Sequence, residues 1–441
     1  MRSRLIVSFL LVTSGIAIAQ PAPPPEPAPP AEPAPVAVEP PPPPEPAPPV
    51  PPAPIAVPAP VAVKPDDKPA VTAKYDGGLK LGTADKMYEL KLSFRNQFRF
   101  ESNRSFDTES PTRQNQFTNR FFIPRSRLQA EGHLFGNDNR FKVEMNLGDQ
   151  GSFGFLKDMF LEKRVPGTPA YVRAGQWKRP FNRSELVSDF AAQLNERSIQ
   201  NDLAGGGRDL GVAIHNEYEK SPEGIEWAVG VFNGFSGGSD RPVQTTTCTQ
   251  NGAGTITCAN SRPATFPTDF GPAIVARVGY NSPKIKGYSE SDLEGGPLRY
   301  AVGGSYKIDL ANFAKQDEES VSDNLSHGLE VDTMIKAMGF SLHAGVVMMK
   351  LKSADAEYGA FAQAGMMVIP KHAEVAGRFA LVTVGDRNRI EARGAFNWFW
   401  YGHTLKLASD AGFVQLTGRD PMTMAKDKPD LQIRVMMQLQ I

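Results

Sequence analysis

The sequence is short of the residues and runs on which several protein classes depend. Only two of its 441 residues are cysteines, and its six histidines are scattered without the close spacing of a metal-ligand pair. Basic and acidic residues balance at 48 each, so no net charge favours a nucleic acid as partner. The Gly-Gly-Gly run at 205–207 lacks the Gly-Lys-Ser/Thr sequence of a phosphate-binding loop. We therefore predict no enzyme: no catalytic residue, no metal and no cofactor.

Long hydrophobic runs are also missing, apart from one at the N-terminus. Arg2 and Arg4 precede an apolar run from Leu5 to Ile18, and the small residues around position 19 offer a cleavage pattern. The run is too short to span a bilayer, and no later run is long enough for a transmembrane helix. We expect residues 1–19 to be a signal peptide and the mature chain to be exported.

Residues 20–74 hold 24 of the 39 prolines and almost no large apolar side chain. Proline cannot donate to a helix or sheet, so this segment cannot build a core and should be a disordered, extended linker in the periplasm. Two interpretations stay open. The linker is either a tether that reaches toward peptidoglycan or a passive solubilising leader.

From Tyr88 to Ile441 the chain repeats stretches of about ten residues in which apolar and polar side chains alternate. This period-two pattern predicts an all-β fold, an antiparallel transmembrane β-barrel of about 16 strands over residues 75–441, with the apolar face toward lipid. A soluble β-sandwich is the alternative that shares the alternation. The expected strands are 88–100, 121–133, 140–148, 155–163, 170–176, 210–218, 225–233, 273–281, 299–309, 329–337, 340–350, 358–368, 373–384, 390–401, 403–415 and 431–441.

The connections between these segments support a barrel, because most short ones alternate with longer ones. With the N-terminus inside, the short connections become periplasmic turns. Ser282 to Leu298 is too long for a simple turn. The 33-residue connection from Trp177 to Asp209 is our candidate for a loop folded into the lumen, and it carries five basic and five acidic residues.

Several motifs together resemble the porin O and P family of phosphate-selective porins. They are Arg125-Ser126-Arg127 leading to Glu131-Gly132, Leu156-Lys157-Asp158 with Phe160, Gly175-Gln176-Trp177-Lys178-Arg179-Pro180-Phe181, Glu196-Arg197-Ser198 and Gly207-Arg208-Asp209-Leu210-Gly211. The resemblance implies a sixteen-stranded barrel in outer-membrane lipid, usually a homotrimer, that passes phosphate or related anions along basic lumen residues.

We therefore predict a porin of the bacterial outer membrane for passive diffusion of small hydrophilic solutes. Six basic residues are candidates for contact with anions, and the near-neutral balance predicts only a weak anion preference. In the competing interpretation each is paired with Glu131, Glu185, Asp202 or Asp209 and only rigidifies the wall. A structural anchor that tethers the envelope through its proline-rich arm, and a barrel enzyme or receptor, are the alternative functions. The six candidates are Arg125, Arg127, Lys178, Arg179, Arg183 and Arg208.

The two cysteines, Cys248 and Cys258, bracket a stretch rich in Thr, Asn and Gly with a weak strand pattern. In an exported protein we expect them to form a disulfide that clamps an outer loop. A metal pair is the lesser option, since no histidine lies nearby.

Overall fold

A computed structural model describes residues 71–106, 115–148, 155–204, 207–234, 245–250, 256–261, 272–310, 325–351, 355–385, 387–418 and 428–441. The predicted signal peptide and most of the predicted linker lie outside these residues. The first strand, β1(Val71–Tyr75), begins four residues before the boundary expected at residue 75.

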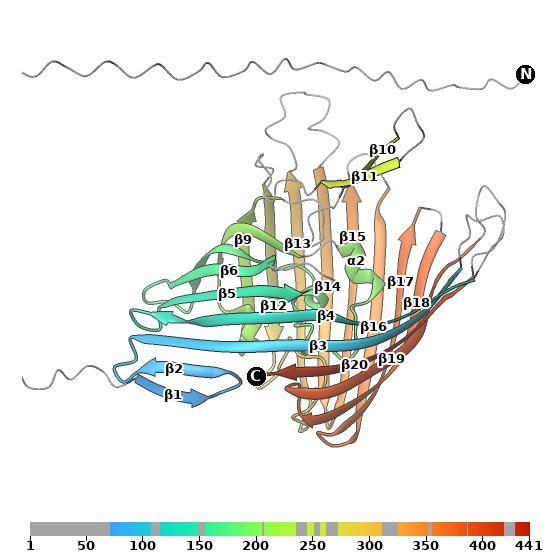
Figure 1. Cartoon of the computed structure of the whole chain (residues 1–441). Helices are drawn as coiled ribbons and strands as arrows, with labels where there is room; N and C mark the ends of the chain where they lie inside the picture. The colour runs from blue at the N-terminus through green and yellow to red at the C-terminus, as the bar shows by residue number, and fades with distance from the viewer. Residues whose placement is uncertain are drawn as a thin grey trace, which may run out of the picture. The chain divides into compact units, whose positions relative to one another are not determined.

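Sixteen antiparallel strands form a closed barrel, because the last of them, β20, pairs with the first, β3 (Figure 1). The predicted fold is thereby confirmed, and each of the sixteen expected segments overlaps one barrel strand. The strands are β3(Tyr88–Phe106), β4(Asn115–Leu134), β5(Asn139–Gly148), β6(Phe155–Arg164), β7(Tyr171–Lys178), β8(Arg208–His215), β9(Gly224–Phe232), β12(Ala273–Asn281), β13(Arg299–Leu310), β14(Leu325–Ala337), β15(Phe340–Leu351), β16(Glu357–Ile369), β17(Ala373–Val384), β18(Arg387–Tyr401), β19(Leu405–Leu416) and β20(Asp430–Gln440).

The side-chain alternation separates the two faces of the wall as expected. In β3, Gln97 and Arg99 are buried in the interior, whereas Phe98 between them is 51% exposed on the outer surface. In β20, Ile433 is exposed and Arg434 is buried. The outer surface is apolar and the interior is polar, which is the arrangement of a barrel surrounded by lipid and lined by water.

Placing a charge in the middle of the outer surface should destabilise the barrel strongly. Met159 is 54% exposed at the centre of β6, and an Arg there should cost about 2 to 4 kcal/mol in lipid. Leu134 ends β4 at the rim that the predicted orientation places in the periplasm, and the same change there should cost about 0 to 1 kcal/mol. Urea titrations of both variants folded in lipid vesicles measure the difference. Equal losses would contradict the proposed membrane depth.

A hairpin that the alternation did not predict extends the barrel wall. β2(Leu79–Thr83) pairs with β1 and also with β3, from Leu79 opposite Leu92 to Gly82 opposite Glu89. The pairing of β20 with β3 begins only at Arg95, so the hairpin covers the part of the β3 edge that β20 leaves open. A Cβ on Gly78 in its turn would lie 2.5 Å from the Leu92 carbonyl oxygen, so the close approach of the turn to β3 requires glycine.

A second hairpin, β10(Thr245–Gln250) and β11(Ile256–Ser261), forms a separate two-stranded sheet. Its register places Cys248 directly opposite Cys258. Directly opposed positions on neighbouring strands are close enough for a cross-strand disulfide. The disulfide stays a prediction, since the side chains of this hairpin lie outside the described part.

We expect Cys248 and Cys258 to resist alkylation in protein purified without reductant and to react after reduction, as measured by mass spectrometry. Because the barrel strands are held by their own ladder, changing both cysteines to serine should leave channel conductance and barrel folding almost unchanged. Free thiols in the unreduced protein would contradict the disulfide.

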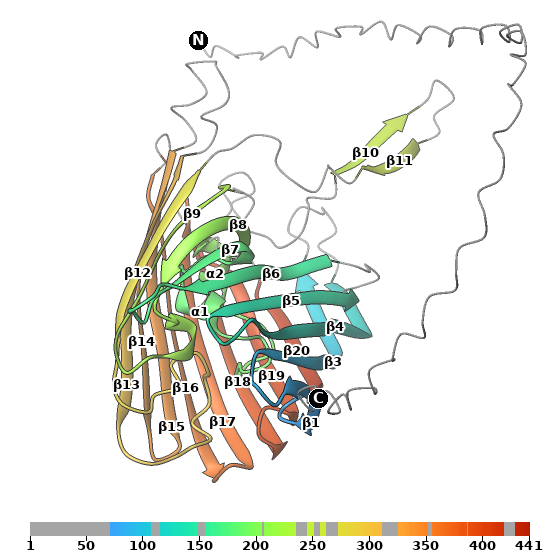
Figure 2. The same cartoon turned by 90° about the vertical axis from the view of Figure 1, so that its left-hand side faces the viewer.

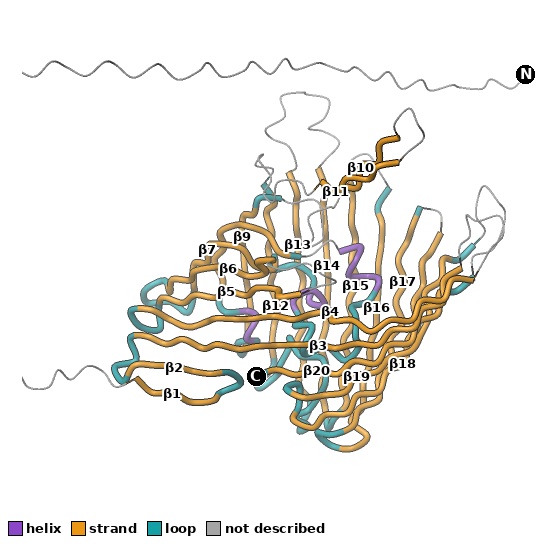
Figure 3. Tube along the Cα trace, viewed as in Figure 1, coloured by secondary structure: helices purple, strands orange, loops and turns teal. Residues whose placement is uncertain are grey.

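The interior of the barrel holds two connecting segments (Figures 2 and 3). The connection between β7 and β8, which we call the lumen loop (residues 179–207), includes α1(Arg183–Leu186) and α2(Ile199–Ala204). The connection between β12 and β13, which we call the periplasmic segment (residues 282–298), also folds inward and does not form a simple turn. A short 3-10 helix, η1(Tyr218–Lys220), lies in the turn between β8 and β9. No helix among the described residues is both long and apolar enough to span a bilayer.

The lumen loop crosses the barrel and packs on the wall opposite its own strands. The Asn195 amide donates to Asp410 on β19, and the Ile199 amide donates to Glu391 on β18, at 2.9 and 3.0 Å. Gln438 on β20 donates to the Phe190 carbonyl at 2.8 Å. The predicted candidate for a lumen-filling connection is therefore placed in the lumen by the structure.

Candidate functional site

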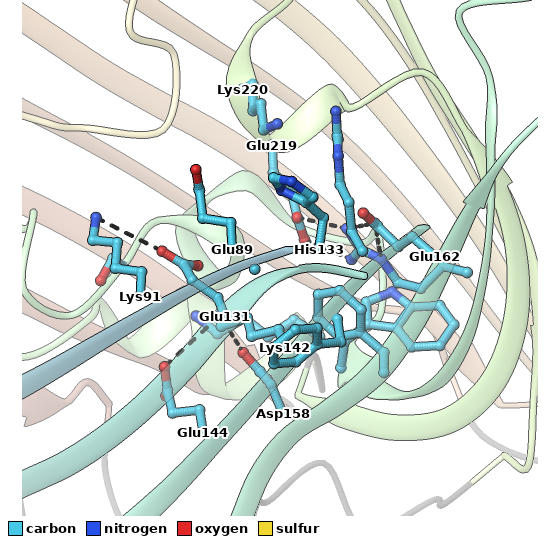
Figure 4. Close-up of a pocket in the computed structure, with 18 of the residues that line it drawn as sticks. Glu89, Lys91, Glu131, His133, Lys142, Glu144, Asp158, Glu162, Glu219 and Lys220 are labelled. Atoms are coloured by element: carbon cyan, nitrogen blue, oxygen red, sulfur yellow. Dashed lines mark hydrogen bonds and ion pairs between the residues drawn. The ribbon is translucent and has the colours of Figure 1, made fainter. Parts of the chain in front are cut away.

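A cavity of about 560 Å³ lies between the lumen loop and the wall from β2 to β8 (Figure 4). Ten basic and seven acidic side chains line it, so charge in the cavity is mixed with an excess of cations. The basic residues are Lys80, Lys91, Arg95, Arg127, Arg140, Lys142, Arg173, Lys178, Arg208 and Lys220, and the acidic residues are Asp76, Glu89, Glu131, Glu144, Asp158, Glu162 and Glu219.

Four of these basic residues meet around one carboxylate in the middle of the barrel. We call Arg95, Arg127, Lys142 and Arg208 the central cations. Glu144 Oε1 lies 3.2 Å from Arg127 Nη1 and 3.5 Å from Arg208 Nη2. Glu144 Oε2 contacts Arg95 Nη2 and lies 3.8 Å from Lys142 Nζ. Glu144 alone cannot neutralise four cations, and two further carboxylates share them.

A second carboxylate, Asp158 on β6, shares two of the central cations. Its oxygens lie 2.7 Å from Lys142 Nζ and 2.6 Å from Arg208 Nε. Figure 4 shows Lys142 between Glu144 and Asp158, with an ion pair to each. A third carboxylate, Asp189 of the lumen loop, lies 2.6 Å from Arg127, so four cations face three carboxylates. Lys142, Asp158 and Arg208 lie on β5, β6 and β8. All three side chains are on the inward face of the wall, so they meet in the lumen.

The lumen loop contacts the central cations from the side that faces away from the wall. The Phe190 ring lies 5.2 Å from the Arg95 guanidinium and 5.6 Å from that of Arg127, which suits cation–π contacts. Asp189 next to it lies 2.6 Å from Arg127, 3.3 Å from Arg125 and 2.5 Å from Arg197. The loop therefore both narrows the lumen and orients the arginines of β3 and β4.

Two carboxylates hold this loop, and their pKa values are low. Burial alone would raise the pKa of Asp189, but Arg125, Arg197 and Arg127 outweigh it and hold the pKa well below its ordinary value. Burial of Glu196 is likewise outweighed by Arg125 and Arg99, which lower its pKa to about 2. Both groups remain charged throughout the neutral range.

The ion pairs that Asp189 and Glu196 make should therefore persist in moderate acid. A carboxyl whose folded pKa is depressed stabilises the fold above its ordinary pKa and loses that contribution only as pH falls through the folded value. Single-channel conductance should therefore stay constant from pH 7 to about 4 and change only under more acidic conditions. A step in conductance between pH 7 and 5 would contradict the assignment of Asp189 and Glu196 as the groups that hold the loop.

Three of the six candidate residues, Arg127, Lys178 and Arg208, line the cavity. Lys178 Nζ also donates to the carbonyls of Glu185 and Val187, at 2.5 and 3.3 Å, and so ties the wall to the loop.

The other three candidates lie outside the cavity lining and hold the lumen loop in place. Arg125 lies 2.7 Å from Glu196, and Arg179 lies 3.4 Å from Asp309 and 3.8 Å from Asp209. Arg183 is fully buried. These three residues are paired, as in the competing interpretation, but of the partners named there only Asp209 is present in the described part of the chain, next to Arg179; Arg125 pairs with Glu196 and Arg183 with Asp332.

Sequence reasoning did not select several cations that line the cavity. Arg95, Lys91, Arg140, Lys142 and Arg173 line the cavity but are not among the six candidates. A usable signal was present, because Arg140, Lys142 and Glu144 alternate with apolar residues on β5 and must share one face.

Near the periplasmic end, the cavity is lined by pairs of opposite charge. Lys80 lies 2.6 Å from Glu89, and Lys91 lies 3.8 Å from Glu131. Each pair balances itself, so the excess of cations is concentrated at the central cluster rather than at this mouth.

Comparisons with known proteins agree with this geometry. A family model described as "Phosphate-selective porin O and P" matches residues 94–277, which run from β3 into β12. No curated protein matches the sequence significantly.

Among solved structures, the chain is similar to the anion-selective porin from Comamonas acidovorans, at 11% identity, with 80% of this chain and 99% of that chain covered and a TM-score of 0.51. It is also similar to OprB of Pseudomonas putida at high pH, at 12% identity, with coverage of 81% and 95% and a TM-score of 0.50. The outer membrane channel DcaP of Acinetobacter baumannii is 12% identical, with coverage of 80% and 97% and a TM-score of 0.50. At these identities the likeness shows a shared fold. The motif-based resemblance is thus confirmed over residues 94–277, which match the phosphate-selective porin O and P family and form part of a complete sixteen-stranded porin barrel.

Proposed function

We propose that this protein is a porin of the bacterial outer membrane that lets small hydrophilic solutes diffuse passively and prefers anions. The central cations carry the proposal: on the wall of a polar cavity, four cations face three carboxylates, Glu144, Asp158 and Asp189. Guanidinium and ammonium groups are natural partners of phosphate, carboxylate and other anions. The family match and the anion selectivity of the Comamonas porin support the same preference.

The preference should be modest, because seven acidic side chains share the cavity with ten basic ones. Such a balance favours anions over cations without holding them tightly, which suits a diffusion channel. Phosphate would then be one of several anions that pass rather than the sole solute.

The test is the reversal potential of the purified protein in a planar bilayer under a potassium chloride gradient. The unmodified channel should show the sign of anion preference, and changing Arg95 and Lys142 together to Gln should lower the anion-to-cation permeability ratio by about twofold or more. Changing Lys80 and Lys91 together to Gln is the charge-matched control, because it removes the same two positive charges at the mouth of the cavity instead of at the central cluster. A cation-preferring channel, or equal shifts in both double variants, would contradict the proposal.

We also propose that the mature chain begins near residue 20, that the residues from 20 to 70, ahead of β1, form a periplasmic linker that contacts peptidoglycan, and that the barrel assembles as a homotrimer. Export and porin architecture support these points. N-terminal sequencing of the mature protein, co-sedimentation of the full chain with purified peptidoglycan, and its mass in detergent test them in turn.

A further inference from the structure

We infer that Glu144 is a built-in counter-ion that weakens the hold of the cavity on anions and so sets their rate of passage. This inference rests on the proposed function. Glu144 is not one of the cations that attract anions, and the role inferred for it is to weaken anion binding.

The position of Glu144 is the first step. Its side chain is only 2% exposed, and its two oxygens divide the central cations into two pairs. Oε1 faces Arg127 and Arg208, whose side chains are 6% and 5% exposed. Oε2 faces Arg95 and Lys142, which are 15% and 24% exposed and therefore the ones that a solute in the cavity can reach.

Competition is the second step. Of the four central cations, Arg95 and Lys142 are the two that an anion in the cavity reaches most easily, and both face the same oxygen of Glu144. Because Glu144 is fixed to β5, it competes at every encounter without having to diffuse in. Both cations therefore remain partly neutralised by Glu144, and the affinity of the cavity for the anion is low.

The comparison with Asp158 is the third step. Asp158 pairs with Lys142 and Arg208, so it neutralises one reachable cation and one buried cation. Among the ion pairs of the described residues, Arg95 meets a carboxylate only at Glu144. Removing the charge of Glu144 would leave Arg95 without that partner and the cluster with one more net positive charge.

The expected consequence concerns throughput. A channel passes a solute fast when its site is attractive enough to admit the solute and weak enough to release it. Without the Glu144 charge, multivalent anions such as inorganic phosphate should stay longer and obstruct the flow of chloride. The carboxylate thus favours fast, unselective passage over retention.

The experiment measures chloride conductance in planar bilayers at pH 7 while inorganic phosphate is added, for the full chain and for Glu144→Gln. The concentration of phosphate that halves the conductance should fall by about tenfold in Glu144→Gln, since one unit charge a few ångström from the anion is removed. Glu131→Gln is the matched control, because Glu131 lines the same cavity but is 38% exposed and pairs with Lys91 at 3.8 Å. It should change that concentration by less than about twofold.

Glu144→Asp keeps the charge but withdraws it from Arg95 and Lys142, and it provides a second test if Glu144→Gln folds poorly. It should strengthen the inhibition by phosphate part of the way. Inhibition equal to that of Glu131→Gln in either variant, or weaker inhibition than in the unmodified channel, would overturn the inference and leave the proposed function standing. A preference for cations in the unmodified channel would overturn both.

Discussion

Changing Asp189 to Asn should raise the single-channel conductance about twofold and make the open current noisy. Asp189 is the one loop carboxylate that lies within ion-pair distance of Arg125, Arg127 and Arg197 among the described residues. Without its charge, three arginines lose a shared partner, and the adjacent Phe190 ring is no longer held against Arg95 and Arg127. The segment should then move away from the cavity and widen it.

Asp202→Asn is the matched control, because Asp202 lies exposed on α2 of the same loop. It should leave both conductance and noise unchanged. Single-channel recordings in symmetrical potassium chloride decide between the two outcomes. Equal conductance in the two variants would show that the loop is held by its remaining contacts to β18 and β19.

The sixteen strands were predictable because a barrel wall separates two solvents. Because lipid lies on one side of the wall and water on the other, apolar and polar side chains must alternate along the strands. This period of two can be read from the sequence. The same alternation predicts that the Arg127 side chain points into the lumen, since Gln129 and Glu131 lie on the same face of its strand. Lys142 and Glu144 could have been found by the same rule.

The roles of Arg179 and Arg183 could not be read in this way, because a loop has no fixed alternation. Their directions depend on partners far along the chain, such as Asp309 and Asp332, which only the closed barrel brings near. The β1–β2 hairpin could not be predicted from the sequence for a different reason. Its ten strand residues follow a proline-rich segment and pair with the part of the β3 edge that β20 leaves unpaired. That unpaired edge becomes apparent only when the end of β20 is known.

Changing Arg183 to Met should be among the most damaging single substitutions in the barrel interior. Arg183 is fully buried, contacts Asp332 and lies 3.4 Å from Glu226, and it donates to the Gly287 carbonyl at 2.9 Å. It therefore joins the lumen loop to the wall and to the periplasmic segment at one point. Its backbone amide also donates to Glu330 at 3.1 Å.

Without this guanidinium, two buried carboxylates would lose an ion-pair partner. Among the ion pairs of the described residues, Glu226 and Asp332 would keep only Arg277, which lies 3.2 and 2.7 Å from them and also 3.4 Å from Glu330. Removing one partner from a buried charge network costs about 3 to 5 kcal/mol, because the uncompensated charge cannot reach water. Met has a similar length, so the loss should come from the guanidinium charge, including its cation–π contact with the Tyr288 ring, rather than from a cavity.

Arg164→Met supplies the control for this substitution. Arg164 pairs with Asp138 at 3.7 Å at the surface, where both side chains are about half exposed, and such a pair contributes about 0 to 1 kcal/mol. Urea unfolding of both variants in lipid vesicles should therefore separate them by about 3 kcal/mol or more. If Arg183→Met were as stable as Arg164→Met, the lumen loop would be held by its contacts to β18, β19 and β20 instead, and Asp189 would become the residue on which the width of the channel depends.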